Sequence, residues 1–595
     1  MAEDKDFNDV LEDIFLGEER QHKQSYEEGF RAGKESGNPE GYHLGYHRGA
    51  ELGRELGHYL GTVTHYIKSQ ETSESKYPDK VILQLTKVKE LIDSFPRDNS
   101  KDHDILGLAE TIRAHYKKAC ALLKISSANP YDEGKLQEHI KSITCYLNPL
   151  LPLANCHMVE FLTENHWDNL VPEHLRKELD GWDRVWDFQF TLNRFWDLET
   201  TVSKAFITAS RNHCLAVNDY CLSLEQLQDR LASWGGRAKP EINITGFMNS
   251  KKSYEVATMS RLVASLYEAT SSTCCLEAGG GRGHLLVALS LGYQISSLTV
   301  DCDEDKLRTA ANRVKMIQKQ WHAISKRKNN EKTQTELSLD QNHTDQIKPV
   351  NLHRFATSFI TKDTNLVAVV EEKFPELIDN VKLLLTGLHT CGDLGPSSLR
   401  IFASRPSTAA VFNVPCCYHL LTESIGDNSG FPMSSHLKGY KLGRNARMLA
   451  AQSMDRVVSE RQMPADSLLY RALLQVLIKK HLPNASISEG KLKRLSSKCT
   501  NFNQYFKMAD AILNLGLYDS LPQGCLIEIC NDVDRQWRKL VIFYLLKMCL
   551  AQVIESVILL DRLMFLFEND FEKVFLVKLF DPILSPRCHG IVAVR

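Results

Sequence analysis

A glycine-rich loop with an acidic residue before it is the segment of this sequence best suited to holding a small-molecule cofactor. It stands between an apolar stretch typical of a strand, 274–277, and one typical of a helix, 285–289. Glycines let the backbone turn sharply and approach a ligand closely. Asp301 ends the next predicted strand, where a carboxylate can hold ribose hydroxyls. The fixed positions of the loop are Glu277, Gly279, Gly281 and Gly283.

The acidic residue of the loop discriminates between two cofactor classes. A dinucleotide brings a pyrophosphate, which prefers a helix N-terminus without a carboxylate nearby. Glu277 instead suits the positively charged methionine group of S-adenosylmethionine. We therefore favour S-adenosylmethionine over a nicotinamide cofactor. The remaining alternative is a glycine turn that binds no ligand.

Polar residues follow two later strand candidates, 382–388 and 409–414, in the runs Gly-Leu-His-Thr-Cys-Gly-Asp and Asn-Val-Pro-Cys-Cys-Tyr-His. Ligands of open parallel sheets bind beyond the carboxyl ends of the strands. Methyl transfer from a sulfonium depends mainly on a well-positioned nucleophile, and a hydroxyl acceptor gains from a general base. The candidate catalytic residues are His389, Asp393 and His419.

Other polar residues of these segments are interpreted as positioning the substrate. Lys251 and Lys252 are basic residues near the cleft, although lysines at a helix start are more often simply solvated. Arg444 and Arg447 are read as surface charges first and as a substrate clamp second. The predicted substrate-positioning residues are Lys251, Lys252, Asn413, Cys416 and Cys417.

The same cysteines and histidines allow two further readings. The ligand types suit zinc, but adjacent cysteines seldom bind one ion together, so no metal is predicted. Alternatively, the thiols are small buried side chains and the histidines are satisfied by hydrogen bonds. The residues considered for a soft-metal site are His389, Cys391, Cys416, Cys417 and His419.

The run after the fourth strand of the α/β region also argues against one methyl acceptor. An enzyme acting on the N6 atom of adenine commonly presents Asn/Asp-Pro-Pro-aromatic there. This chain has His389-Thr-Cys-Gly-Asp393 instead. Asn413-Val-Pro415 follows the fifth strand, which is the wrong position.

A second kind of glycine pattern occupies the beginning of the chain. Each glycine inside a helix costs about 1 kcal/mol relative to alanine, so nine cost on the order of 9 kcal/mol. Close approach by the backbone of a partner helix is the compensation we expect, and the partner must wind with a stripe of period four. The nine glycines, at a constant spacing of four, are Gly29, Gly33, Gly37, Gly41, Gly45, Gly49, Gly53, Gly57 and Gly61.

Composition limits the remaining classes. The net charge of −2 provides no global basic field, so contact with RNA requires a local patch. The 16 cysteines and the acidic start without an apolar signal region predict reduced thiols and a cytoplasmic or nuclear location. Segment 537–567 is apolar but interrupted by charges, and we expect a buried helix or helix pair and no contact with a membrane.

Periodicity divides the chain into regions. Residues 1–125 form a predicted all-helical unit that contains the glycine-repeat helix, and 126–135 is a linker. Helical segments at 136–245 precede alternating strands and helices at 246–595, which predict an α/β Rossmann-like domain. Within it we expect a mobile polar insertion at 319–350 and a helical insertion at about 440–570, followed by a closing hairpin at 573–594.

Residues from about 129 to 595 resemble the methyltransferase-like protein 25 family. The resemblance implies a class I methyltransferase fold and an S-adenosylmethionine site. Local elements, His-x-Cys-Gly and Cys-Cys-x-His, are similar to those of tRNA 2′-O-methyltransferases, which hints at RNA. Besides the glycine loop and the run 387–393, the family resemblance rests on Leu147-Asn-Pro-Leu-Leu-Pro152, Lys251-Lys-Ser-Tyr-Glu255, Cys416-Cys-Tyr-His419, Leu559-Leu-Asp-Arg562 and Phe580-Asp-Pro-Ile-Leu-Ser-Pro586.

Residues 1–125 resemble the oral-cancer-overexpressed adaptors with a repeated Gly-x-x-x unit, on the strength of the glycine run at 29–61. That resemblance implies a partner with a matching glycine helix, and delivery of the cytosolic iron–sulfur machinery to a ribosome-associated client. The leading hypothesis is thus a methyltransferase that acts on RNA, or on protein, and carries an adaptor unit. The alternative is a non-catalytic adaptor between iron–sulfur assembly and the ribosome.

Overall fold

The chain divides into two compact units, Met1–Lys135 and Leu136–Arg595, next to the predicted linker 126–135. Part of that linker is helical, because α4 begins at Pro130. The computed structural model describes residues 49, 52–53, 55–68, 77–97, 103–123, 130–180, 201–215, 220–242, 248–331, 352–426, 428–460, 464–485, 489–492, 495–530 and 533–595. The predicted glycine-repeat helix before residue 49 lies outside these residues.

The first unit packs three helical segments around one core: residues 55–68, α2 (Asp79–Asp93) and α3 (Ile105–Leu123). Tyr59 stacks on Tyr116 of α3 with ring centroids 3.9 Å apart. Helices α2 and α3 occupy the two stretches whose apolar periodicity predicts helices. The buried residues contributed by segment 55–68 are Leu56, Tyr59 and Val63.

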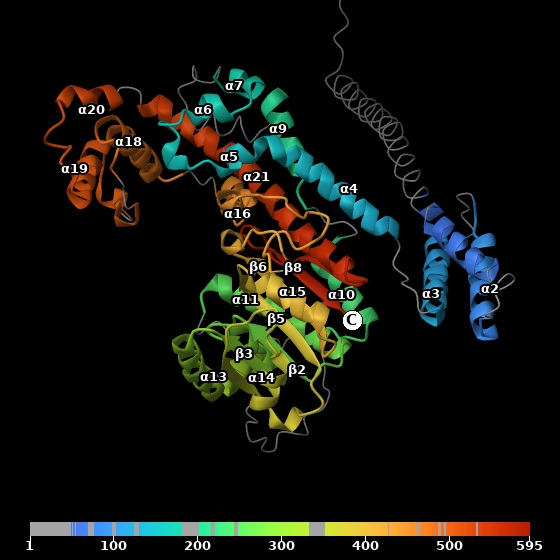
Figure 1. The fold of residues 1–595 in the computed structure, drawn as a ribbon. Coiled ribbons are helices and arrows are strands. Elements are labelled where there is room, and N and C mark those ends of the chain that lie inside the picture. The colour runs from blue at the N-terminus through green and yellow to red at the C-terminus, as the bar shows by residue number, and fades with distance from the viewer. Residues whose placement is uncertain are drawn as a thin grey trace, which may run out of the picture. The chain divides into compact units, whose positions relative to one another are not determined.

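The second unit contains an eight-stranded sheet in the order β1-β7-β8-β6-β5-β2-β3-β4 (Figure 1). Strand β8 runs antiparallel to both of its neighbours, and the other pairs are parallel. This is the predicted class I, Rossmann-like arrangement, extended at one edge by β1. The strands are β1 (Cys221–Leu222), β2 (Cys274–Ala278), β3 (Ser297–Asp301), β4 (His353–Thr357), β5 (Leu383–Cys391), β6 (Thr408–Cys416), β7 (Lys573–Lys578) and β8 (His589–Val594).

Both faces of the sheet are covered by helices, because successive strand residues point to opposite sides. Leu276 of β2 faces the core that contains α15 (Leu394–Ser404) and α21 (Val533–Phe567). Its neighbour Cys275 faces the core that contains α10 (Leu224–Ser233), α11 (Ser250–Ala269) and α12 (His284–Val287). The helices up to the sixth strand are α4 (Pro130–Leu147), α5 (Leu151–Asn155), α6 (His166–Leu170), α7 (Glu173–Asp180), α9 (Thr201–Asn212), α10 (Leu224–Ser233), α11 (Ser250–Ala269), α12 (His284–Val287), α13 (Glu304–Glu331), α14 (Leu366–Lys373) and α15 (Leu394–Ser404).

Helices fill the chain between β6 and β7, where a helical insertion is expected. Among the described residues one of them, Asp534–Phe567, is long and apolar enough to cross a membrane by length and composition, but 89% of its most apolar window is buried inside the protein. Such burial is typical of a core helix, and the expected helix or helix pair is a single helix. These helices are α16 (Arg444–Leu449), α17 (Met454–Ser459), α18 (Asp466–His481), α19 (Phe502–Leu513), α20 (Gln523–Cys530) and α21 (Val533–Phe567).

Some boundaries differ from those expected. Helix α13 continues to Glu331, so the first part of segment 319–350 is helical, as its many Lys, Arg and Glu residues allow. The remainder, from 332, lies outside the described residues. Strands β5 and β6 end at Cys391 and Cys416, beyond the expected limits of 388 and 414, because the pairing resumes after a register shift at Gly387. The polar and glycine residues of that run concealed the strand.

Candidate functional site

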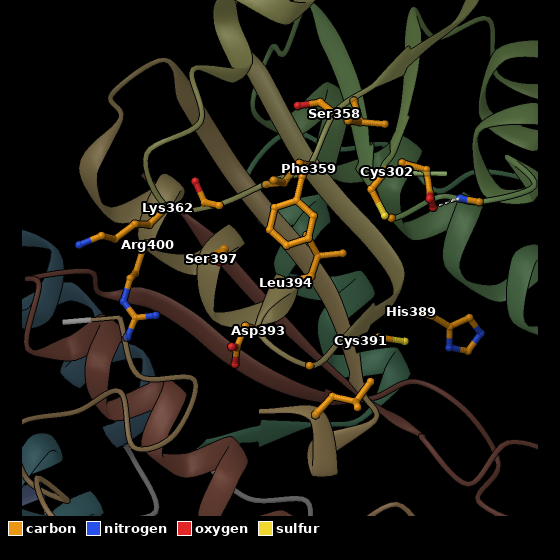
Figure 2. Close-up of a pocket in the computed structure, with 18 of the residues that line it drawn as sticks. Cys302, Ser358, Phe359, Lys362, His389, Cys391, Asp393, Leu394, Ser397 and Arg400 are labelled. Carbon is orange, nitrogen blue, oxygen red and sulfur yellow. Dashed lines mark hydrogen bonds between the residues drawn. The ribbon is translucent and has the colours of Figure 1, made fainter. Parts of the chain in front are cut away.

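A cavity of about 900 Å³ lies at the carboxyl ends of β2, β3, β4 and β5. Its wall includes the glycine loop, the residues after β3 and β4, the end of β5 and the first turns of α15. Figure 2 shows the Phe359 ring projecting into the cavity, with His389 and Cys391 on one side and Lys362 and Arg400 on the other. This is the edge at which open parallel sheets bind ligands.

The glycine loop needs its glycines for backbone geometry. Gly279, Gly281 and Gly283 all have positive φ angles, of 68°, 50° and 65°. A Cβ atom on Gly279 would lie 2.6 Å from the Leu394 side chain. Gly279 and Gly281 line the cavity, so the loop presents backbone to any occupant. The loop therefore has the close-approach geometry expected from the sequence.

Asp301 lines the same cavity and is held by the loop. Its Oδ2 accepts a hydrogen bond of 2.9 Å from the backbone N–H of Gly281, and its Oδ1 accepts one of 3.0 Å from that of Asp303. Each carboxylate oxygen has a second lone pair available for a hydroxyl donor. The acid is thus fixed in a position from which it can receive two ribose hydroxyls.

Glu277 lies behind the loop rather than among the residues that line the cavity. Its carboxylate occupies the space where a side chain on Gly280 would be, since a Cβ there would lie 2.7 Å from Oε2. Oε2 has no hydrogen-bond partner, and burial raises the pKa of this carboxyl group to about 8. The group is a buried acid directly beneath the backbone that a ligand would contact.

The segment after β4 is a part of the site that the sequence analysis missed. Phe359 is 75% exposed although it is a large aromatic residue, and it belongs to the cavity wall with Ser358 and Lys362. An exposed ring at the edge of an apolar-lined cavity offers a stacking surface for a purine. The available signal was an aromatic residue directly after a strand that ends at the same edge as the glycine loop.

His389 occupies the end of β5 and lines the cavity. Its Nε2 lies 3.2 Å from Oε2 of Glu255, a buried residue of α11. Burial alone would raise the pKa of Glu255, but hydrogen bonds from His389 and Ser585 and the charge of Lys252 outweigh it and hold this pKa well below its usual range. Glu255 is therefore an ionised carboxylate that orients His389. The sequence analysis did not assign this role to Glu255.

The two lysines expected near the substrate are engaged by the same carboxylate. The Nζ atoms of Lys251 and Lys252 lie 3.7 Å and 3.1 Å from Glu255 oxygens. Neither lysine is among the residues that line the cavity. Arg447 is buried rather than a surface charge, and its Nη1 donates to the backbone oxygens of Tyr418 and Leu421.

The remaining candidate residues separate into two groups. Asp393 lines the cavity, and its Oδ1 accepts a hydrogen bond of 2.8 Å from the backbone N–H of Thr422. His419, in the turn Tyr418–Leu420, is absent from the cavity wall, and its Nδ1 is buried without a partner. Asn413 is buried within β6, and neither of its amide atoms has a partner.

Three cysteines converge at the ends of β5 and β6. The sulfur atoms of Cys391, Cys416 and Cys417 all lie within 4.8 Å of one another, and those of Cys391 and Cys416 are 3.0 Å apart. A hydrogen bond from Cys416, together with Cys417, His389 and Arg587, lowers the pKa of the Cys391 thiol to about 6. The hydrogen bond to Cys391 and burial raise the pKa of Cys416, and burial raises that of Cys417. One negative charge is thus centred on Cys391, which lines the cavity.

Comparison with known proteins assigns this region. The family model described as "Methyltransferase domain" matches residues 251–424, which include the glycine loop, Asp301, His389 and the three cysteines. The chain carries a methyltransferase domain. A second family model, described as "Essential protein Yae1, N terminal", matches residues 25–63. No solved structure matches the chain.

The methyltransferase domain lies within a longer similarity. Proteins named "Probable methyltransferase-like protein 25" from Mus musculus and from Homo sapiens are each 28% identical to this chain. Both alignments cover 78% of this chain, and they cover 97% and 98% of the two relatives. Both resemblances expected from the sequence, to this family and to the glycine-repeat adaptors, are therefore confirmed.

Proposed function

We propose that the methyltransferase domain uses S-adenosylmethionine. The observation that carries this proposal is the cavity in which the backbone of Gly279 and Gly281, the carboxylate of Asp301 and the ring of Phe359 share one wall. Asp301 would receive the ribose hydroxyls, Phe359 would cover the adenine, and the loop would receive the methionine part. The cofactor would supply the methyl group on its sulfonium.

The residues at the end of β5 would serve the methyl acceptor. His389 is held by Glu255 through Nε2, so its other ring nitrogen, Nδ1, can accept a proton from an acceptor hydroxyl. Asp393 lines the same part of the cavity, and its side chain is fixed there by the backbone N–H of Thr422. A hydroxyl nucleophile would lose its proton to His389 while its oxygen bonds to the methyl carbon, and the carbon–sulfur bond would break to leave a neutral thioether.

We propose RNA as the acceptor because basic residues lie beside the cavity. A second hollow of about 870 Å³ shares Lys362, Asp363 and Arg400 with the first and adds Arg405 and Lys438. Phosphates of a nucleic acid are bound by Lys and Arg side chains. The local resemblance to tRNA 2′-O-methyltransferases points the same way, to a ribose hydroxyl.

The cofactor assignment is tested by binding labelled S-adenosylmethionine to the full chain. Gly281→Asp places a carboxylate beside Asp301 and should abolish binding. Gly516→Asp is a matched control, because Gly516 also has a positive φ, of 67°, with no atom near its missing Cβ, and is absent from the cavity wall. Equal binding by the two variants would refute the site.

The acceptor is tested with fractionated cell extract and purified enzyme. Label from the cofactor should enter RNA and should resist alkaline cleavage at the modified ribose, because a 2′-O-methyl group blocks attack on the adjacent phosphate. The double variant Lys362→Ala/Arg400→Ala should lower transfer more than cofactor binding. Transfer into protein alone would replace RNA as the acceptor.

A second function is favoured by the first unit, which we propose docks on another glycine-repeat protein. Gly49, Gly53, Gly57 and Gly61 are exposed, and a Cβ on any of them would meet no atom within 4 Å. The opposite side of this segment is packed in the core. The free space beside these four glycines permits close approach by another backbone, and we propose that the partner docks along the whole repeat, 29–61.

By resemblance to the adaptors, this docking would connect iron–sulfur assembly to a ribosome-associated client, in the cytoplasm or the nucleus. The full chain should co-purify with a second glycine-repeat protein, and Gly53→Leu/Gly57→Leu should prevent it. Leu83→Ala, at an exposed residue of α2, should leave co-purification unchanged. Loss of the partner from this control alone would contradict the docking surface.

A further inference from the structure

The three thiols at the ends of β5 and β6 form a cluster whose purpose methyl transfer does not explain. Cys391 belongs to β5, Cys416 is the last residue of β6, and Cys417 follows it. The register of the sheet pairs Cys391 directly with Cys416. Two of the thiols therefore converge by strand pairing, and the third must be brought in by the backbone.

The backbone at Cys417 provides that third approach. Neighbouring residues in an extended strand point their side chains to opposite faces of the sheet. Cys417 departs from this rule because its φ is 50° and its ψ is 48°, in the left-handed region that non-glycine residues seldom adopt. The kink turns its sulfur to the same side as that of Cys416. The sequence argument against shared binding by adjacent cysteines is thereby removed.

Arginine side chains near the cluster favour negative charge on it, whereas burial opposes that charge at Cys416 and Cys417. Arg587 acts electrostatically on all three thiols, and in each case it favours the thiolate. Arg562 is 1% exposed, its Nε and Nη1 atoms have no hydrogen-bond partner, and its charge interacts with Asp561, Cys416 and Asp393. A buried guanidinium with unfilled hydrogen-bonding capacity is costly unless negative charge balances it. A set of thiolates bound to one divalent ion would add negative charge to that of the two carboxylates.

We propose that Cys391, Cys416 and Cys417 bind a single zinc ion, with the fourth coordination position open to the cofactor cavity. Each sulfur would bind the ion as a thiolate, and any proton that it still carries would be released to solvent. Three protein ligands and one open position characterise catalytic rather than structural zinc sites. We expect the open position to face the cavity because Cys391 belongs both to the cluster and to the cavity wall.

The distances select a single ion. Zinc–sulfur bonds of about 2.3 Å in a tetrahedron place the sulfurs roughly 3.8 Å apart. The observed limit of 4.8 Å and the short separation of 3.0 Å bracket that value. A 4Fe–4S cluster would need wider spacing, because each of its cysteines binds a different iron atom. Thiolates also favour zinc over magnesium or calcium.

The test uses the full chain purified in the presence of a phosphine reductant. Elemental analysis should find about one zinc per chain, and replacement by Co²⁺ should give a strong near-ultraviolet band from thiolate-to-cobalt charge transfer. Cys391→Ser and Cys417→Ser should each lower the zinc content at least tenfold. Circular dichroism and thermal unfolding report whether each variant is folded.

Cys302→Ser is the matched control, because Cys302 lines the same cavity, is exposed and lies outside the cluster. It should retain the zinc of the unsubstituted chain. The proposal is overturned if the reduced unsubstituted chain binds less than a tenth of an equivalent and shows no charge-transfer band. It is also overturned if Cys302→Ser loses as much zinc as the cluster variants, or if Cys391 and Cys416 form a disulfide that persists in reductant.

The open position has its own readout. A small thiol such as 2-mercaptoethanol should add a sulfur ligand to the Co²⁺ form and intensify the charge-transfer band. An unchanged band would mean that a fourth protein ligand closes the site. None of these measurements depends on methyl transfer, and cofactor binding with Gly281→Asp remains a separate assay.

Discussion

The two units of this chain use glycine for opposite purposes. In the methyltransferase domain, loop glycines are required by the fold: Gly279 has a φ of 68°, and a side chain there would meet Leu394 at 2.6 Å. In the first unit, Gly57 is helical and exposed, and a side chain there would meet nothing within 4 Å. A glycine that its own fold does not require is available for contact with a partner protein. The contrast separates residues that build a site from residues that await a partner.

The strongest way to break this comparison is to add a side chain to each kind of glycine. Gly279→Val should destabilise the methyltransferase domain by roughly 3 kcal/mol, because it combines strain at positive φ with a clash against Leu394. Chemical denaturation, followed by a probe of the second unit, measures the loss. A change below about 0.5 kcal/mol would mean that the loop glycines are as dispensable as the exposed ones.

A second prediction concerns the chemistry that distinguishes the two units. His389→Gln should lower the rate of methyl transfer about 100-fold, since the variant keeps a donor for Glu255 but loses the proton-accepting nitrogen. Binding of the cofactor should change little. Single-turnover assays separate the two effects. Glu255→Gln, which leaves the His389 ring in place but weakens its orientation along with the ion pairs to Lys251 and Lys252, should cost less and should shift the pH profile of the rate.

A third prediction uses the buried acid beneath the loop. Glu277 has a pKa of about 8 in the folded protein against an ordinary value of 4.5, so the folded state binds this proton more tightly than the unfolded state. The stability that this proton confers is complete below pH 4.5 and is lost as the pH rises to about 8. Glu277→Gln should remove this loss, by roughly 4 kcal/mol at pH 8. Urea denaturation of both proteins across that window, without cofactor, measures the difference, and parallel curves would contradict it.

The smallest expected effect is a stabilisation of the first unit, opposite in sign to the destabilisation expected for Gly279→Val. Gly57→Ala should stabilise that helix by at most about 1 kcal/mol, because alanine is the better helix former and the site is open. The same variant should weaken binding of a glycine-repeat partner, since the added methyl group separates the two backbones. Thermal unfolding and co-purification give the two readouts. Destabilisation would show that the glycine stripe already packs inside its own unit.

The sequence predicted well those elements whose signals are local. The strand, glycine loop and following acid occur as expected, because tight turns and buried strands leave clear patterns over a few residues. The closing hairpin was also predicted, from two apolar runs around turn residues, and is confirmed as β7 and β8. The class I arrangement of the sheet follows the order expected from the resemblance.

The parts that escaped prediction depend on contacts between distant segments. Glu255 precedes His389 by 134 positions, and nothing in either segment indicates their hydrogen bond. The side on which Cys417 projects depends on a left-handed backbone that the letters Cys-Cys do not encode. Phe359 was missed although it is an aromatic residue directly after a strand, because its exposure at the cavity edge becomes visible only in the structure. Spatial convergence, not residue type, was the missing information.

Strand β8 inserts between β6 and β7, although β6 ends at Cys416 and β8 begins only at His589. During synthesis β6 therefore remains an unpaired edge on one side while more than a hundred further residues emerge. A chain that ends before position 589 would therefore keep one edge of β6 unpaired, and such an edge can pair with a strand of another chain.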